Sequence, residues 1–323
     1  MKKIAVILVL ALIAISCNEN KGQKYLPKSV GAINSLSVII DNDLWKGEVG
    51  DELRKYFAAP VDGLPWDEPL FSIHQMPPVV FSDFVTKSRN IIVVEKNITS
   101  KSVIKDEVYS RPQKIGYFTG ENEEELIHLI QEHAPAMIEE MKLQELAEKQ
   151  QRIKRSLNKE TAIKEKLGVS LTMPSVYKIA KEEDNFFWID REILKGSMNI
   201  LIYEMPLNSI SNDSTQIQSI IQMRDSIGKK YIPGPVEGSY MSTEKAYAPY
   251  LFEAEIAGRP ALEVKGMWDV TGYFMAGPFI NYIVEDPDKN RLIVAEGFTF
   301  APSTNKRDYM FELEAILKTL TIE

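Results

Sequence analysis

The sequence predicts an α+β fold in which antiparallel sheets pack against amphipathic helices. Short β-rich runs recur along the whole chain and are separated by turn-forming residues. Each half of the chain ends in an apolar run, followed by a segment with one apolar stripe at helical spacing. The composition, 44% hydrophobic and 26% charged over 323 residues, is that of a globular protein with about two domains.

The N-terminus is expected to be a lipoprotein signal peptide over residues 1–16. Two lysines precede an unbroken apolar run from Ile4 to Ile15. At 1.5 Å per residue this run is about 18 Å long, too short to cross a hydrocarbon core of ~30 Å. The alternative is a short uncleaved anchor followed by an incidental cysteine.

The cleavage site Ala14-Ile-Ser-Cys17 resembles a bacterial lipobox, in which the cysteine receives a diacylglyceryl group. Cys17 is the only cysteine, so the chain forms no intrachain disulfide, and lipidation accounts for its position. Residues 17–34 are polar and turn-rich and are expected to be a flexible tether. Asn18 after the cysteine favours the outer membrane, which predicts a lipid anchor on its periplasmic face.

Residues 35–141 are expected to form a first α+β unit. Strands are predicted at 36–40, 70–75, 90–94 and 114–118, with a more polar extended segment around 102–109. Apolar residues at helical spacing predict a helix over 41–58, and Pro60 terminates it. The three prolines of residues 60–69 make that segment a loop.

A long helix is predicted to begin at Asn122, because Glu125 stands three residues later as in a capping box. Pro135 is expected to kink this helix, since its ring removes one backbone hydrogen bond. Residues 142–167 are highly charged with a sparse apolar seam, which predicts a helical connector. The domain boundary is therefore expected near Gly168.

Residues 168–323 are expected to form a second α+β unit with a β-meander and a C-terminal helix. Strands are predicted at 169–173, 176–180, 186–190, 198–203, 249–256, 261–268, 278–284 and 292–300, and helices at 214–227 and 309–320. Glu285–Asn290 is predicted to be a hairpin turn.

The two units show a weak internal similarity. Residues 89–95 resemble residues 197–204, and both units are predicted to end with a strand that leads into an amphipathic helix. This pattern indicates two related α+β units joined by a long kinked helix. The alternative is chance similarity between buried strands.

Motifs for catalysis, metal binding or cofactor binding are not found in the sequence. Of the three histidines, His128 and His133 are five residues apart and do not share one helix face. No metal site and no cofactor are therefore expected. The net charge of −8 argues against a nucleic-acid partner, because nucleic-acid binders present a basic face.

Aromatic residues provide the candidate binding positions. Trp66 lies in the proline-rich loop, Tyr240 ends the Gly/Pro-rich segment 232–240, and Trp268 ends a predicted strand. They are candidates to line a glycan- or peptide-binding groove. The alternative is that they belong to the core, and for Trp268 we expect burial against the sheet.

Four segments resemble a known family. They are Gly47–Phe71, Gly234-Pro-Val-Glu-Gly-Ser-Tyr-Met241, Gly266-Met-Trp-Asp-Val…Gly-Pro-Phe279 and Glu296–Leu317. They resemble the family of uncharacterised Bacteroidetes lipoproteins that carry a single domain of unknown function. Ala276 stands where the family pattern usually has glycine. The resemblance implies an envelope lipoprotein and transfers no catalytic residue.

Two functions are compatible with the sequence. The first is a membrane-tethered, non-enzymatic envelope lipoprotein that binds a protein or glycan of the envelope. The second is an enzyme on an envelope polymer that uses loop carboxylates, for which the pairs Asp51/Glu52 and Asp67/Glu68 are the candidates. An enzyme requires titratable groups that converge in one pocket, whereas a binding module can present an apolar or aromatic surface.

Lipidation at Cys17 is directly testable by metabolic labelling with a palmitate analogue. We expect the wild-type chain to be labelled and membrane-bound, because acyl chains contribute ~0.8 kcal/mol per buried methylene. Cys17→Ser is expected to lose both the label and membrane association. Equal labelling of the variant and the wild type would contradict the assignment.

Overall fold

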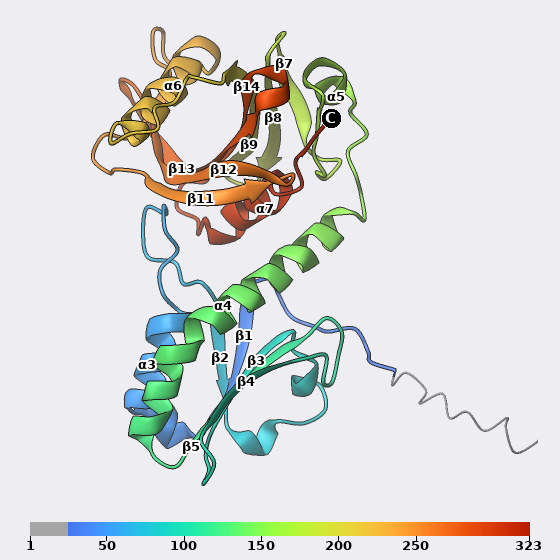
Figure 1. Ribbon diagram of the computed structural model, residues 1–323, viewed down its shortest axis with the longest axis vertical. Coiled ribbons are helices and arrows are strands. Elements are labelled where there is room, and N and C mark those ends of the chain that lie inside the picture. The colour runs from blue at the N-terminus through green and yellow to red at the C-terminus, as the bar shows by residue number, and fades with distance from the viewer. Residues whose placement is uncertain (1–24) are drawn as a thin grey trace, which may run out of the picture.

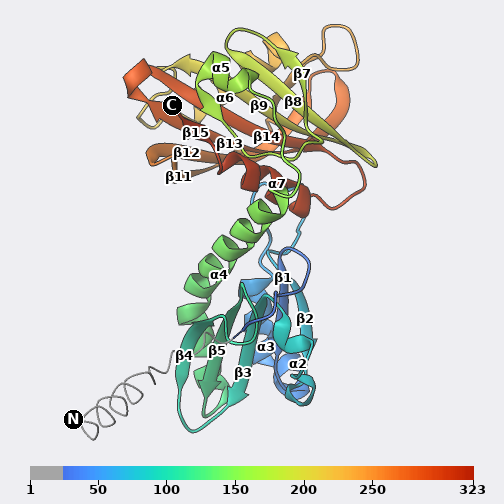
Figure 2. The ribbon, with the colours of Figure 1, turned by 90° about the vertical axis from the view of Figure 1, so that its right-hand side faces the viewer.

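The computed structural model describes residues 25–323 and has two lobes (Figure 1). The first lobe holds the N-terminal half, the second lobe holds the C-terminal half, and the long helix α4 (Glu123–Ile153) runs from one to the other (Figure 2). In residues 25–323 no helix is long and apolar enough to span a membrane. The predicted signal peptide and residues 17–24 of the predicted tether lie outside the described residues.

A five-stranded sheet forms the centre of the first lobe, in the order β2-β1-β3-β5-β4. The strands are β1 (Ser35–Ile39), β2 (Ser72–Met76), β3 (Asn90–Lys96), β4 (Lys101–Asp106) and β5 (Lys114–Gly120). Helices α2 (Asn42–Lys46) and α3 (Glu48–Phe57) lie between β1 and β2 in the chain, and α4 follows β5. Apolar residues of α3 and α4 pack with those of β1, β3 and β5 in one buried cluster.

The pairing in this sheet differs from the expected antiparallel arrangement. β1 is parallel to both β2 and β3, and β3 is parallel to β5, so only the β4–β5 pair is antiparallel. Parallel neighbours require long crossovers, and α2 with α3 supplies the one between β1 and β2. The near-continuous apolar runs of β1 and β3 are typical of strands buried on both faces.

The second lobe is built on an antiparallel sheet in the order β10-β12-β13-β14-β9-β8-β7, with β11 paired to β12. The strands are β7 (Lys178–Glu182), β8 (Phe186–Ile193), β9 (Gly196–Pro206), β10 (Met241–Thr243), β11 (Tyr250–Ile256), β12 (Arg259–Val270), β13 (Tyr273–Asp286) and β14 (Arg291–Phe300). This sheet confirms the predicted antiparallel meander and the α+β class. The turn predicted at Glu285–Asn290 is confirmed, with Asn290 in the left-handed conformation.

The curled sheet has a helix on each face. Helix α6 (Gln216–Tyr231) lies over the concave face, and α7 (Arg307–Leu317) packs on the opposite face (Figure 1). Smaller elements complete the lobe: α5 (Ala162–Leu167), the 3-10 turn η3 (Pro287–Lys289), and a two-stranded sheet of β6 (Val169–Ser170) and β15 (Thr321–Ile322). The lobe has two buried apolar cores, one under each helix.

Each lobe contains the predicted strand that leads into an amphipathic helix, although the two sheets differ in strand direction. β5 leads into α4, and β14 leads into α7, as expected. The similar segments 89–95 and 197–204 occupy β3 and β9. β3 lies in a mainly parallel sheet and β9 in an antiparallel one, so the similarity does not extend to topology.

Helix α4 contains Pro135 and changes direction along its length (Figure 1). Its C-terminal part packs against α7 of the second lobe, where the Lys149 ammonium lies 2.7 Å from a Glu312 carboxylate oxygen. The Gln150 side chain donates to the Ala315 carbonyl at 3.1 Å. Residues 142–167, expected as a connector, comprise the end of α4, a loop and α5.

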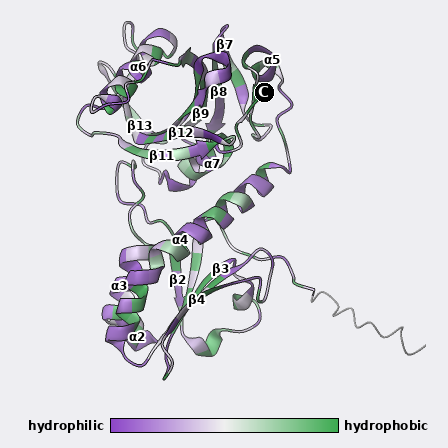
Figure 3. Ribbon diagram, viewed as in Figure 1, coloured by the Kyte–Doolittle hydropathy of each residue, from purple (hydrophilic) through white to green (hydrophobic). Residues whose placement is uncertain are grey.

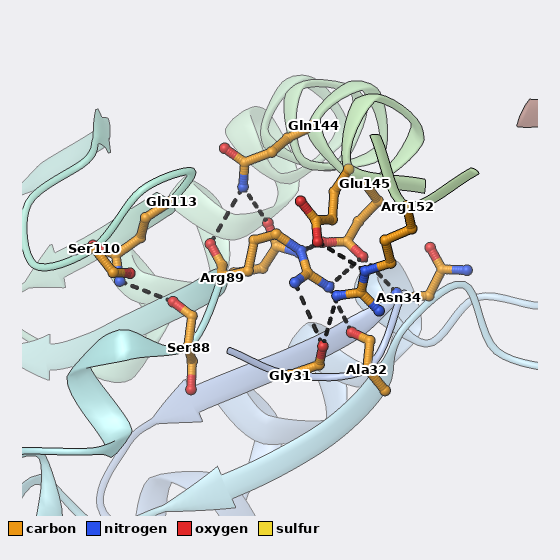
Figure 4. A network of polar contacts seen from close by, with 12 residues as sticks. Gly31, Ala32, Asn34, Ser88, Arg89, Ser110, Gln113, Gln144, Glu145 and Arg152 are labelled. Atoms are coloured by element: carbon orange, nitrogen blue, oxygen red, sulfur yellow. Dashed lines mark hydrogen bonds and ion pairs between the residues drawn. The ribbon is translucent and has the colours of Figure 1, made fainter. Parts of the chain in front are cut away.

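A buried ion pair fixes α4 to the start of β3. The Arg89 guanidinium donates to both carboxylate oxygens of Glu145, at 2.5 and 3.0 Å, and neither side chain is more than 1% exposed (Figure 4). The Asn90 amide also donates to Glu145, at 2.7 Å, and the Asn34 N–H donates to it at the same distance. Arg89 further donates to the Ala32 carbonyl, so one charge pair joins the N-terminal arm, β3 and α4.

Replacing Glu145 with glutamine should destabilise the fold strongly. The change leaves the Arg89 charge buried without a countercharge, and such losses cost roughly 3–5 kcal/mol. Glu123→Gln, on the same helix, removes a surface pair with Lys96 and should cost under ~1 kcal/mol. Urea melts of both variants measure the difference, and equal midpoints would contradict the role given to Glu145.

Candidate functional site

The sequence-predicted site residues lie in different parts of the molecule. Cys17 lies outside the described residues. Trp268 and Tyr240 belong to the second lobe, on β12 and on the segment that precedes β10. Trp66 belongs to the loop of residues 60–69, which contacts the second lobe from the first. The structure therefore does not join these aromatics into one groove.

Trp268 is buried, as predicted, with 1% of its surface exposed. Its ring packs edge-on against Phe298 of β14, with centroids 5.5 Å apart, and also contacts Phe300 at 6.4 Å. It stands opposite Gly277 of β13 in the antiparallel pairing. The indole N–H has no hydrogen-bond partner among the described residues.

A cavity of about 260 Å³ lies beside Trp268, just beyond the C-terminal end of α6. We call it the Trp268 pocket. It is lined by Trp188, Ser197, Asn199, Ile232, Pro233, Gly234, Pro235, Met241, Trp268, Val270, Met275, Phe298 and Phe300. Its walls are therefore mainly apolar and aromatic, with two neutral polar side chains, which is the usual make-up of a small-molecule or side-chain binding site.

Two glycines allow the segments around the pocket to approach each other. A Cβ on Gly234 would stand 2.3 Å from the Ser239 hydroxyl and 2.5 Å from Val270. A Cβ on Gly277 would stand 2.1 Å from the Thr299 carbonyl oxygen. No larger residue fits either position without displacing the backbone or the pocket wall. Segments 234–241 and 266–279, which carry the family resemblance, thus meet at this pocket.

The polar side chains of the pocket are held in place by each other. The Trp188 indole N–H donates to the Asn199 side-chain oxygen at 3.0 Å. The Asn199 amide donates to the Ser197 hydroxyl, also at 3.0 Å. Among the described residues that line the pocket, none has a titratable side chain. The arrangement is suited to binding an apolar group and offers no acid, base or charged nucleophile.

Tyr240 lies on the segment that forms one wall, but its side chain does not line the pocket. Its backbone N–H donates to the Thr271 hydroxyl at 3.1 Å, and its carbonyl accepts from the Thr271 N–H at 3.0 Å. The Lys229 ammonium lies 5.8 Å from the centroid of its ring. These contacts attach segment 232–240 to the β12–β13 hairpin.

Trp66 and Glu68 belong to the junction between the lobes. The Lys306 ammonium lies 3.7 Å from the centroid of the Trp66 ring, and 46% of Trp66 remains exposed. The two carboxylate oxygens of Glu68 accept the backbone N–H groups of Lys306 and Arg307, at 2.7 and 2.8 Å. Glu68 therefore caps the N-terminus of α7 from the other lobe, where a negative charge is stabilising.

The other loop and helix carboxylates proposed for acid/base work do not converge. Asp51 pairs with Arg54, and Glu52 pairs with Lys55, each three residues along α3. Asp67 is exposed. Within residues 25–323 there is no group of three or more histidine, cysteine or carboxylate side chains that could hold a metal ion.

Several buried titratable groups lie on the face of the sheet that α7 covers. Burial opposes ionisation of Glu312, yet Lys149, Arg191 and the Tyr177 hydroxyl outweigh it and lower the pKa of that carboxyl. Burial likewise lowers the pKa of Lys265, but Glu314 and Glu263 reverse the effect and raise it. Both shifts favour the charged forms at neutral pH, which is expected of structural ion pairs rather than of a general acid or base.

Sequence reasoning found Trp268 but not the rest of its pocket. Trp188, Asn199 and Phe298 lie on three different strands and share the face that α6 covers. Alternation along each predicted strand separates its two faces, but it does not show which faces of distant strands adjoin. The Gly/Pro-rich composition of segment 232–240 was the one local signal that pointed to the site.

Truncating Trp268 should cost much of the stability of the second lobe. Trp268→Ala is expected to lower the free energy of unfolding by about 3–5 kcal/mol, because it removes a buried indole and leaves a cavity. Trp66→Ala removes a half-exposed ring and should cost under about 1.5 kcal/mol. Denaturant melts of the chain without its lipid anchor compare them. A midpoint shift near zero for Trp268→Ala would contradict its core role.

Comparisons with known proteins give matches to two family models and to solved structures. Domain of unknown function DUF8532 matches residues 29–154, so two family models divide the chain where a single domain was expected. No curated protein matches. Among solved structures the chain is similar to LpqN of Mycobacterium tuberculosis, which is described as involved in cell envelope biogenesis. The two chains are 12% identical and superpose with a TM-score of 0.28 over 47% of this chain and 82% of LpqN. Domain of unknown function DUF4837 matches residues 156–319, more than half of the 323 residues, and the chain therefore belongs to the DUF4837 family.

Proposed function

We propose that this chain is a Bacteroidetes-type envelope lipoprotein, anchored through Cys17 at the periplasmic face of the outer membrane, and that it binds an apolar group of an envelope partner in the Trp268 pocket. The single observation that carries the binding role is the composition of this pocket. It is walled by aromatic and aliphatic side chains from six segments and contains no titratable group among its described residues. The partner is an envelope protein or glycan that presents such a group.

The anchoring part of the proposal comes from the sequence. A basic start and a 12-residue apolar run lead into a lipobox-like segment, Ala14–Cys17, which ends in the chain's only cysteine. Two or three acyl chains at that position hold a folded body firmly at a membrane surface. The polar residues that follow Cys17 then supply the tether, up to the arm that bonds to the first lobe through Ser29 and Val30.

The alternative, an enzyme on an envelope polymer, has less support. Such an enzyme requires a pair of carboxylates that face one substrate. Glu68, one of the candidates, is occupied by two backbone N–H groups of α7. The buried carboxylates Glu263 and Glu312 have lowered pKa values, with burial opposing ionisation and neighbouring cations outweighing it, so neither is poised to donate a proton near neutral pH.

Binding of an apolar probe tests the proposal. N-phenyl-1-naphthylamine is titrated into the chain without its lipid anchor, with energy transfer from Trp188 and Trp268 as the signal. We expect saturable binding by the wild type. Met275→Glu places a charge on the pocket wall and should weaken binding by about tenfold or more, since burying an unpaired charge is costly.

The matched control is Met205→Glu. Met205 is half-buried like Met275 and packs against the same core cluster, but it does not line the pocket. The Met205→Glu variant should bind the probe like the wild type. Equal weakening by both substitutions, or no saturable binding by the wild type, would refute the binding role of the pocket. A melt of each variant separates loss of binding from loss of fold.

A further inference from the structure

The first lobe carries a group of exposed apolar side chains on the segment of residues 77–88. Val79 is 87% exposed and Phe84 is 67% exposed, with Val80 beside them at 44%. The segment contains two short 3-10 turns, η1 (Pro78–Val80) and η2 (Val85–Lys87). Figure 3 shows η1 as a hydrophobic turn at the lower edge of this lobe. Neighbouring exposed apolar residues of this size mark an interaction surface.

The same segment also has residues that do pack inward. Phe81 and Val85 cover the small core formed by Ile39, Ile91 and Ile115, and Phe81 meets Tyr109 edge-on at 5.9 Å. The segment is therefore anchored to the sheet. The outward direction of Val79 and Phe84 is a property of the folded segment and not of a loose loop.

The N-terminal arm enters the lobe beside this segment. The Val30 N–H donates to the Lys87 carbonyl at 2.9 Å, and the Ser29 N–H donates to the Arg111 carbonyl at 3.0 Å. Figure 4 shows Ser88, Ser110 and Gln113 next to Arg89 and the arm residues Gly31 and Ala32. Tyr25, at the start of the described arm, is itself 87% exposed. The arm is thus bonded to the C-terminal end of the segment, at Lys87, three residues after Phe84.

The length of the tether limits how far Tyr25, at the start of the arm, can lie from a bilayer. Cys17 stands eight positions before Tyr25, and eight extended residues span at most about 29 Å. Lys28 is exposed at the same edge and Lys87 is partly exposed, while Arg111 is paired with Glu107 and the segment itself carries the exposed Asp83. The charges of this edge largely balance, so its apolar side chains, held near a bilayer by a short tether, are what suit it to the headgroup region.

We propose that residues 77–88, together with Tyr25, form a second membrane contact, in which Val79, Val80 and Phe84 enter the headgroup region of the bilayer. The occupant of this surface is a phospholipid bilayer. The proposal rests on the anchoring at Cys17 proposed above, which brings the segment to the membrane. The contact fixes how the first lobe faces the bilayer, whereas a lipid anchor alone leaves the orientation free.

The experiment attaches a fluorophore to the segment on a membrane-tethered chain. Because Cys17 is the only cysteine, replacing residues 1–17 with a histidine tag leaves a cysteine-free chain that accepts one label. The tag holds the chain on vesicles of phosphatidylcholine and phosphatidylglycerol that contain a nickel-chelating lipid. Val79→Cys labelled with nitrobenzoxadiazole should brighten roughly twofold on the vesicles and be quenched by nitroxide-labelled lipid, as for a residue buried about 5–10 Å into the interface.

Leu194→Cys provides the matched control. Leu194 is 97% exposed, lies on the β8–β9 turn of the second lobe and should show neither brightening nor quenching. Equal responses at both positions, or no response at Val79, would overturn the proposal. Because the tag replaces the lipid, a negative result concerns the segment alone, while palmitate labelling tests Cys17 and the naphthylamine titration tests the Trp268 pocket.

Discussion

The buried ion pair between Arg224 of α6 and Glu296 of β14 holds the second lobe in its observed form. The guanidinium donates to both carboxylate oxygens at 2.8–3.1 Å and also reaches the Thr243 hydroxyl at 3.0 Å. The Asn281 amide adds a further bond to Glu296 at 2.9 Å, and the Arg224 guanidinium lies over the Phe279 ring. A charge pair in this position specifies where α6 crosses the concave face, because a shifted helix would leave both charges buried and unpaired.

The Trp268 pocket is a consequence of that placement. Since α6 ends at Tyr231, it covers the middle of the concave face and leaves the strand ends beyond it to segment 232–240. That segment can close over the aromatic side chains only because Gly234 and Gly277 lack a Cβ. The result is a partly covered apolar cavity at the end of a rigid sheet, a setting in which a binding site keeps its shape.

The junction between the lobes is also held by carboxylates, which accept hydrogen bonds from donors on another helix or loop. Glu68 caps α7 from the first lobe, and Glu312 of α7 accepts from Lys149 of α4 and from the Tyr177 hydroxyl at 3.0 Å. The lowered pKa of Glu312 means that its contribution to stability is present above the unfolded pKa and is lost as the pH falls through the folded one. These acids support the fold, and the pocket in the second lobe is made without them.

The sequence by itself determined the α+β class, the long helix from Asn122, the hairpin turn at Asn290 and the burial of Trp268, because each follows from local patterns: periodicity, capping, turn chemistry and apolar context. Only the tertiary structure decided that β1, β2, β3 and β5 are parallel, and that Trp188, Asn199 and Phe298 share a cavity with Trp268. Likewise, Glu68 is one of many acids in the sequence. It caps the N-terminus of α7 only because the fold brings it to the backbone N–H of Lys306, more than 200 residues away. Neighbouring strands and contacts between the lobes join residues that are far apart in the sequence. No local pattern encodes which distant partner a residue will meet.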